Sequence, residues 1–210
     1  MRFINKWSYT CAKSLASVLE ENHQKKAEYY FGFQVALGGI VKTALLVAVS
    51  MILGVLIPTL IVSICFALLR KVAGGYHMDT YGKCLLVSIA LFVFAALIAK
   101  HTYRYWSIAL LVILITLTFT IGLYVLIRYA PRDTPNRLIT DLQEIRKFKA
   151  LSIAYICVWL AVVTVLTILE MKMYTILLCF GVLQELFAIT PIHMFFDKIK
   201  YGLAPKQKPC

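Results

Sequence analysis

The chain has 210 residues, of which 61% are hydrophobic and only 15% are charged. This composition excludes a soluble globular domain of that size. Its formal net charge of +12 does not indicate nucleic-acid binding, because the basic residues flank apolar runs and do not gather in one patch. The sequence therefore predicts an all-α integral membrane protein.

Residues 1–30 carry apolar side chains at helical spacing, including Phe3, Trp7 and Leu15, with lysines between them. Such a pattern is typical of an amphipathic helix. Because its polar side is basic, we expect it to lie at the interface of a membrane that contains anionic lipids.

Six apolar runs follow, at 35–56, 58–69, 84–99, 107–127, 151–169 and 174–192. Spanning a bilayer takes about 20 residues, so we expect the short second run to end within the cytoplasmic half of the membrane. The first two runs form either a hairpin or one helix kinked at Pro58. We expect about six transmembrane or partly penetrating helices in a single membrane domain over 1–210, with the bundle at 35–192 and a cytoplasmic tail at 193–210.

The distribution of basic residues decides between the two arrangements. With a hairpin, the N-terminus, 70–83, 128–149 and the tail all face one side and together hold 18 of the 22 Lys and Arg residues. Loops rich in Lys and Arg stay in the cytoplasm. The sequence therefore favours the hairpin, with both termini and the segment 70–84 cytoplasmic.

The six cysteines lie in separate segments without a CxxC or another metal-ligand spacing, so we expect neither a disulfide framework nor a metal site. No cofactor is expected either. Cys65, Cys157 and Cys179 lie inside apolar runs, where cysteine usually behaves as a small buried hydrophobe. Only Cys84 has reactive residue types near it in the sequence.

The segment 70–84, RKVAGGYHMDTYGKC, is the densest cluster of reactive and flexible residues. A cysteine thiol needs a base or an electropositive site to react at neutral pH, and His77 is the base at hand for Cys84. Thr80 or Asp79 is expected to cap the third membrane helix, so that its dipole favours the thiolate.

The spacing between His77 and Cys84 restricts how they meet. Residues seven apart on one straight helix are about 10 Å apart along its axis, so His77 must lie on a loop or on a helix that folds back. Gly74 and Gly75 supply the freedom for that turn, and Arg70 is a candidate for orienting a substrate carboxylate or carbonyl. Taken alone, His77 and Cys84 are also compatible with a polar cytoplasmic loop in which a histidine and a cysteine have no chemical function.

The string R-x-x-x-G-G-x-H-x-x-x-x-x-x-C resembles the signature of the accessory gene regulator B (AgrB) family of Gram-positive bacteria. A second stretch, YAPRDTPNRLI at 129–139, resembles the family's Ala-Pro-x-x-Thr-x-Asn-(Lys)-Pro segment, although Arg137-Leu138 replaces the usual basic-Pro pair. Chain length and the number of apolar runs fit as well, so the resemblance covers nearly the whole chain.

The resemblance implies a membrane cysteine endopeptidase of the bacterial cell membrane. Such an enzyme removes the C-terminal part of an AgrD-like propeptide and promotes cyclisation to a quorum-sensing thiolactone or lactone. It implies Cys84 as the nucleophile, His77 as general base and acid, and Arg70 and Gly75 as supporting residues. A homodimer is also implied, and Gly38 and Gly39 are a weak cue for close helix contacts.

Several features remain open from the sequence. A cytoplasmic basic belt either attracts an acidic substrate or only sets topology and binds lipid; it consists of Arg128, Arg132, Arg137, Arg146, Lys147 and Lys149. Glu185 either pairs with Lys42 or lines a peptide path. The alternative function is a small polytopic transporter or exporter without protease activity, although no internal symmetry supports it.

Overall fold

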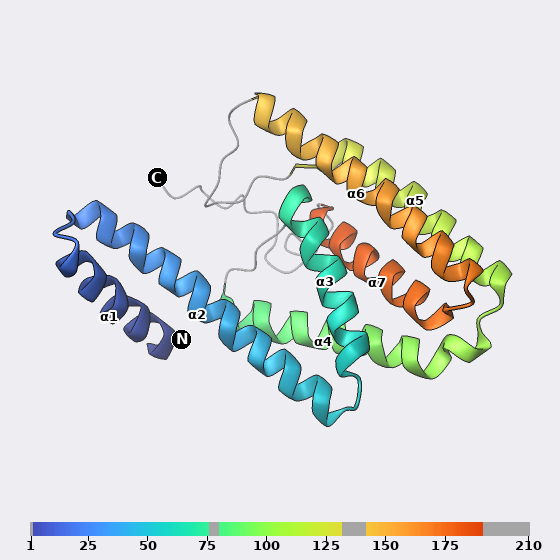
Figure 1. The fold of residues 1–210 in the computed structure, drawn as a ribbon, viewed down its shortest axis with the longest axis horizontal. Helices are drawn as coiled ribbons and strands as arrows, with labels where there is room; N and C mark the ends of the chain where they lie inside the picture. The colour runs from blue at the N-terminus through green and yellow to red at the C-terminus, as the bar shows by residue number, and fades with distance from the viewer. Residues whose placement is uncertain (1, 76–79, 132–141, 191–210) are drawn as a thin grey trace, which may run out of the picture. The chain divides into compact units, whose positions relative to one another are not determined.

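The computed structural model describes residues 2–75, 80–131 and 142–190. These residues form helices and no β-strand (Figure 1). In chain order the elements are α1 (Arg2–Val18), α2 (His23–Ile52), α3 (Leu56–Ala73), α4 (Tyr81–Thr102), the 3-10 helix η1 (Tyr103–Tyr105), α5 (Ile108–Tyr129), α6 (Leu142–Ile168) and α7 (Lys172–Ile189).

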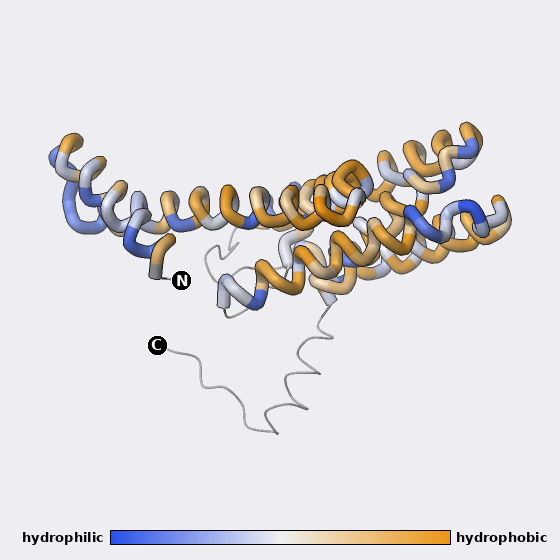
Figure 2. Tube along the Cα trace, turned by 90° about the horizontal axis from the view of Figure 1, so that it is seen from below, coloured by the Kyte–Doolittle hydropathy of each residue, from blue (hydrophilic) through white to orange (hydrophobic). Residues whose placement is uncertain are grey.

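Six helices, α2 to α7, are long and apolar enough to cross a membrane. Figure 2 shows apolar residues along most of the helical trace, with polar residues near the N-terminus and at helix ends. This arrangement confirms the predicted all-α membrane fold with an additional N-terminal helix. The second predicted run is longer than expected, because α3 has 18 residues.

The break between α2 and α3 is a Schellman motif four residues before Pro58. Gly54 has a positive φ of 64°, its N–H donates to the Met51 carbonyl, and the Val55 N–H donates to the Ser50 carbonyl. These are the two bonds that close a helix on a left-handed glycine. A single helix kinked at Pro58 is thereby excluded, and the proline instead lies in the first turn of α3, where it is tolerated.

A similar turn separates α1 from α2. Glu20 has φ 51°, the Glu21 N–H donates to the Ala16 carbonyl, and the Asn22 side chain caps α2 by accepting from the Lys25 N–H. The amphipathic helix expected over 1–30 therefore ends at Val18, and the residues from His23 onward belong to α2.

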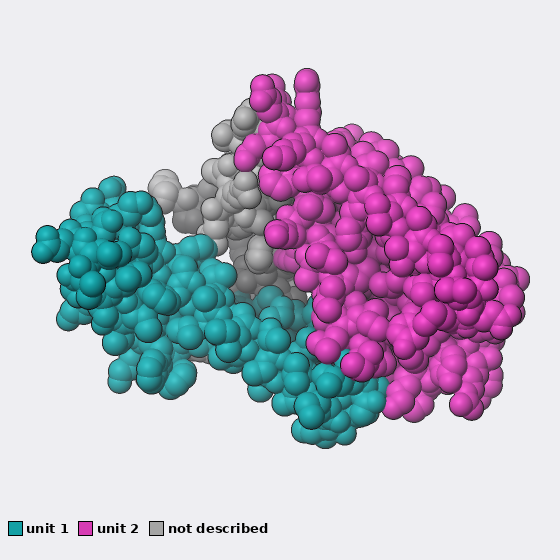
Figure 3. Space-filling model, in the orientation of Figure 1, with its two compact units in different colours: residues 1–56, 78–93 teal, residues 57–77, 94–210 magenta. Residues whose placement is uncertain are grey.

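The chain forms two compact units, coloured separately in Figure 3. The first comprises residues 1–56 and 78–93. Within it α1 packs against α2, and its buried side chains recur every four residues at Ile4, Ser8, Ala12 and Ala16. Mostly small residues on that side let the two helices approach, while larger apolar side chains such as Phe3 remain exposed.

The second unit comprises residues 57–77 and 94–210, and its described residues hold the main apolar core. Its central helix is α7, which is buried on several sides, unlike a helix with one apolar face. The core residues come mainly from α3, α5, α6 and α7; they are Cys65, Leu69, Ala73, Ile115, Val125, Leu126, Ala130, Ile156, Trp159, Val163, Cys179, Val182, Leu186 and Ile189.

The approach of α3 to α7 depends on Gly181. A Cβ at this position would lie 2.9 Å from the Cβ of Cys65 and 3.0 Å from the Val62 carbonyl oxygen. Neither atom is the end of a flexible side chain, so a larger residue would push the helices apart. Gly181 lies one helical turn before Glu185, and its contact with α3 therefore helps to bring Glu185 to the end of α3.

Candidate active site

An ion pair joins the end of α3 to α7. Nη1 of Arg70 lies 3.3 Å from Oε2 of Glu185, although the two residues are 115 positions apart in the sequence. The Glu185 side chain is fully buried, and the Arg70 side chain is 23% exposed. The Arg70 guanidinium also lies over the ring of Phe66, 5.6 Å from its centroid.

The backbone after α3 passes close to this pair. Gly74 has φ 73° and its N–H donates to the Arg70 carbonyl, so it ends the helix in the left-handed conformation that glycine adopts without cost. A Cβ on Gly75 would lie 2.8 Å from Nη1 of Arg70 and 3.0 Å from Oε1 of Glu185. Only glycine leaves room for the ion pair beside the chain at this position.

Cys84 lies at the start of α4. Its N–H donates to the Thr80 carbonyl, the first such bond of the helix, so Thr80 occupies the N-cap position. The side chain is partly exposed and its thiol is free. It is therefore placed at the end of the first turn, where the partial positive charge of a helix N-terminus acts on a nearby anion.

Contacts with α2 fix this end of α4 within the first unit. The Tyr81 hydroxyl donates to the Gly38 carbonyl, and Nζ of Lys42 donates to the Ser88 hydroxyl at 3.0 Å. Tyr81 precedes Cys84 by three residues and Ser88 follows it by four, so both contacts lie within one turn of the thiol along α4.

The predicted site residues fall into separate groups. The second unit brings Arg70, Gly74 and Gly75 together with Glu185, whereas Cys84 belongs to the first unit. His77 lies outside the described residues, and its pairing with Cys84 therefore remains a prediction.

The other cysteines differ in burial. Cys65 and Cys179 are buried, as expected, and Cys65 also contacts Tyr155 on α6, whose hydroxyl donates to the Cys65 carbonyl at 2.9 Å. Cys157 is exposed on the described surface, so the expectation of a buried cysteine is wrong there. Among the described residues, no group of three or more His, Cys, Asp or Glu side chains could hold a metal ion.

The family model described as accessory gene regulator B matches residues 8–189. The match covers α2 to α7 and the whole segment that contains Arg70 and Cys84. This chain belongs to the accessory gene regulator B family. Membership supports a role for this AgrB chain in the processing of agr quorum-sensing peptides.

Similar proteins come from several bacteria. The accessory gene regulator protein B of Staphylococcus lugdunensis is 27% identical over 199 residues, which cover 94% of this chain and 98% of that protein. The protein of the same name from Staphylococcus aureus strain MW2 is 25% identical over 82% of this chain and 86% of its own length. Putative AgrB-like protein 2 of Clostridium perfringens strain 13 is 20% identical over 71% of this chain and 70% of its own length. No solved structure matches the chain.

The described part of the basic belt lies at one end of the second unit of the AgrB chain. Arg128 is exposed in the last turn of α5, and Arg146 and Lys147 are exposed in the N-terminal part of α6, with Lys149 partly exposed. Arg132 and Arg137 lie outside the described residues. Charged side chains at this end are accessible to a substrate or a lipid headgroup.

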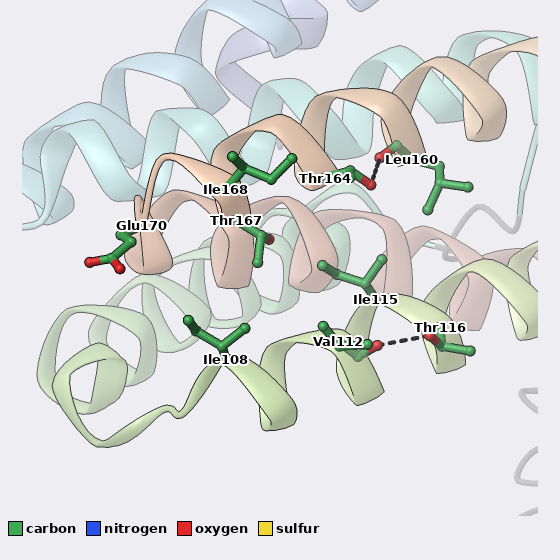
Figure 4. A pocket seen from close by; sticks show the side chains of 9 residues that line it. All are labelled: Ile108, Val112, Ile115, Thr116, Leu160, Thr164, Thr167, Ile168 and Glu170. Carbon is green, nitrogen blue, oxygen red and sulfur yellow. Dashed lines mark hydrogen bonds between the residues drawn. The ribbon is translucent and has the colours of Figure 1, made fainter.

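A groove of about 460 Å³ lies between α5 and α6 at the α6–α7 turn. Figure 4 shows it lined by apolar side chains and threonines, with Glu170 at its edge. Thr116 and Thr164 donate to carbonyls of their own helices, at Val112 and Leu160. Because Glu170 precedes Glu185 by 15 residues, this edge of the groove lies about 20 Å from the ion pair along the helix axis. The lining of the groove contains neither a cysteine nor a histidine.

Glu185 is the residue of this group whose contact the sequence did not predict. Its position inside an apolar run was the available signal, because acids in membrane helices are usually functional or paired. From the sequence, Lys42 was one candidate partner of Glu185, whereas in the structure Glu185 forms its ion pair with Arg70. Spacing along the chain gave no indication of that partner.

Proposed function

We propose that this AgrB chain is a membrane cysteine endopeptidase that removes the C-terminal part of an AgrD-like propeptide. The observation that carries the proposal is the motif from Arg70 to Cys84 within the family match. It combines a nucleophile, a base and a cation with two glycines, and the described geometry around Cys84 and Arg70 is compatible with those roles.

The reaction begins when His77 takes the Cys84 proton and the thiolate attacks the scissile carbonyl carbon of the propeptide. The tetrahedral intermediate collapses with cleavage of the C–N bond, and His77 gives the proton to the departing amine of the C-terminal fragment. The remaining propeptide is then held as a thioester on Cys84. This step needs no cofactor or metal.

Cyclisation follows by acyl transfer. A cysteine thiol or serine hydroxyl within the bound propeptide attacks the thioester carbonyl, its proton passes to His77, and the Cys84 sulfur leaves. A thiol gives a thiolactone and a hydroxyl gives a lactone. Exchange between two thioesters is nearly isoenergetic, and exclusion of water would protect the intermediate from hydrolysis.

The proposal places the site at the cytoplasmic face of the bacterial cell membrane, with both chain termini on the same side. Its support is the charge distribution, since 18 of the 22 Lys and Arg residues belong to the segments on that side. A propeptide made in the cytoplasm would then reach Cys84 without crossing the bilayer.

Cleavage of a synthetic AgrD-like propeptide by the full chain in liposomes tests the function. We expect Cys84→Ala and His77→Gln each to lower the cleavage rate by at least about 100-fold, with unchanged membrane insertion. If the chain is instead an exporter without protease activity, the wild type should not cleave the propeptide.

The matched control is Cys157→Ser, because this cysteine is also free and is more exposed than Cys84. It should retain the wild-type cleavage rate. Wild-type cleavage by Cys84→Ala would refute the proposed function.

A further inference from the structure

The structure divides the apolar side chains of α1 into two groups. Mostly small residues pack against α2, whereas Phe3, Trp7 and Val18 are 70%, 55% and 79% exposed. On a helix with about 3.6 residues per turn these three project from one side, and the ring centroids of Phe3 and Trp7 are 5.7 Å apart. One side of α1 thus presents large apolar side chains that the described residues leave exposed.

Contacts between side chains fix the register of α1 against α2. Nε2 of Gln34 donates to Oδ1 of Asn5 at 2.9 Å, and Nζ of Lys26 donates to the Tyr9 hydroxyl at 3.3 Å. A later position on α1 therefore meets an earlier position on α2, so the two helices are antiparallel, as Figure 1 shows. The start of α1 is level with Gln34, and its end lies beside the start of α2.

The apolar part of α2 begins immediately after Gln34. Over residues 35–52 its only charged residue is Lys42, and this part extends about 27 Å, close to the roughly 30 Å of a hydrocarbon core. Residues 23–34 contain the other charged residues of α2 and add about 18 Å of the same continuous helix. At an ordinary tilt of about 20°, this charged part of α2 projects from the membrane, and α1 projects with it.

We infer that α1 anchors the chain to the bilayer through its first two turns alone, with Phe3 and Trp7 in the phospholipid interface and the later turns held away from it by α2. Tryptophan is enriched at membrane interfaces because its ring is apolar and its N–H reaches polar groups. Lys6 is exposed beside the two rings, where its charge suits the phosphates of anionic lipids. The helix that its sequence predicts to lie along the membrane instead meets the membrane with one end.

Position 18 separates this arrangement from a helix that lies flat on the membrane. Val18 projects from the same side of α1 as Trp7 but lies 11 residues further along, or about 16 Å. A flat helix would place both side chains at the same depth in the interface. Because the register against α2 directs the end of α1 away from the bilayer, only Trp7 reaches lipid.

The test is fluorescence quenching in vesicles of phosphatidylcholine and phosphatidylglycerol whose acyl chains carry bromine near the headgroup. The emission of Trp7 in the full chain is the difference between the wild type and Trp7→Phe. Trp7→Phe/Val18→Trp moves the reporter to position 18. We expect the quenched fraction at position 18 to be at least about threefold smaller than at position 7, because the two positions are about 16 Å apart along the helix.

Trp7→Phe/Leu45→Trp is the matched control within the bilayer. Leu45 is exposed on α2 and follows Gln34 by 11 residues, which places it about 16 Å into the hydrocarbon core. Its reporter should be quenched more by bromine near the end of the acyl chain than by bromine near the headgroup, and Trp7 should show the opposite preference. All three reporter positions are exposed, so we expect the wild-type melting temperature in detergent for each variant.

Equal quenching at positions 7 and 18 would show that α1 lies flat, and would overturn the inference. Emission of Trp7 that brominated lipid does not quench would overturn it as well, because the ring would then lie outside the bilayer. Strong quenching of Trp7 with little quenching at position 18 supports it. The measurement needs no propeptide, so its outcome is independent of the proposed cleavage at Cys84.

Discussion

At the scale of single residues, Gly75 is the most tightly constrained position of the described site. Its Cα hydrogen faces both the Arg70 guanidinium and the Glu185 carboxylate. A side chain there would compete with the ion pair for the same space. The glycine therefore leaves room for this pair of charges beside the backbone that follows α3.

We predict that Gly75→Ala lowers the rate of propeptide cleavage by roughly tenfold to 100-fold, because Arg70 is the candidate for orienting the substrate and a displacement of about 1 Å has effects of this size. The new methyl group would lie 2.8 Å from Nη1 of Arg70 and would move the guanidinium away from Glu185. Steady-state cleavage in liposomes measures the change.

Gly32→Ala provides the comparison, since a Cβ on Gly32 meets no atom within 4 Å. Its cleavage rate should equal that of the wild type. Equal rates for Gly75→Ala and Gly32→Ala would show that the space beside Gly75 has no functional importance.

The sequence indicated which residues belong to this site better than it indicated which of them are in contact. It singled out Arg70, Gly74, Gly75 and Cys84 as a motif, and it noted Glu185 as an unusual intramembrane acid. It could not pair Arg70 with Glu185, because their contact depends on how α3 packs against α7 at Gly181. Only the tertiary structure contains that information.

At the scale of helices, hydropathy predicted the number of membrane segments but not all of their ends. The predicted first run began at residue 35, whereas α2 begins at His23. Its early turns contain Lys25, Lys26 and Glu28, which a search for apolar runs leaves out. The Asn22 cap and the turn at Glu20 determine the start of the helix.

The contact of α2 with α4 yields a prediction about the helix that carries Cys84. We expect Gly38→Leu to destabilise the protein by about 1–3 kcal/mol, because a Cβ on Gly38 would already lie 3.0 Å from the Tyr81 ring. The change should lower the melting temperature in detergent and also slow cleavage.

Gly39→Leu is the matched variant, as the adjacent glycine is exposed and a Cβ there meets nothing within 4 Å. Both substitutions add the same side chain to the same helix, so the difference between them reports the contact with Tyr81. Equal melting temperatures would contradict the importance of that contact.

At the scale of the whole molecule, basic residues gather in a few segments, while the membrane helices carry few charges. This distribution follows directly from the sequence, because the charge of each side chain is known from its residue type. The division of the described residues into two compact units was not predicted, since it depends on contacts between distant segments. Cys84 and Arg70 belong to different units although they lie 14 residues apart.

We predict that the belt raises the affinity for an acidic propeptide tail. Arg146→Gln/Lys147→Gln removes two exposed charges and should raise KM by about tenfold at low ionic strength, with kcat unchanged. The difference from the wild type should vanish near 1 M salt, where the Debye length is about 3 Å.

Lys100→Gln/Arg104→Gln removes two exposed charges outside the belt and should leave KM unchanged at every salt concentration. Membrane insertion of each double variant is checked by protease accessibility of its termini. An unchanged KM for Arg146→Gln/Lys147→Gln at low salt would mean that the belt does not attract the substrate.

The intact mass of the protein after rapid mixing with propeptide and acid quenching tests the role of Cys84 most directly. We expect a transient adduct on Cys84 with the mass of the propeptide minus its C-terminal fragment. Neutral hydroxylamine should remove this adduct, because it cleaves thioesters, and Cys84→Ala should not form it. Propeptide cleavage by the wild type without any adduct on Cys84, under conditions in which Cys84→Ala cleaves equally fast, would contradict the role of Cys84 as the nucleophile.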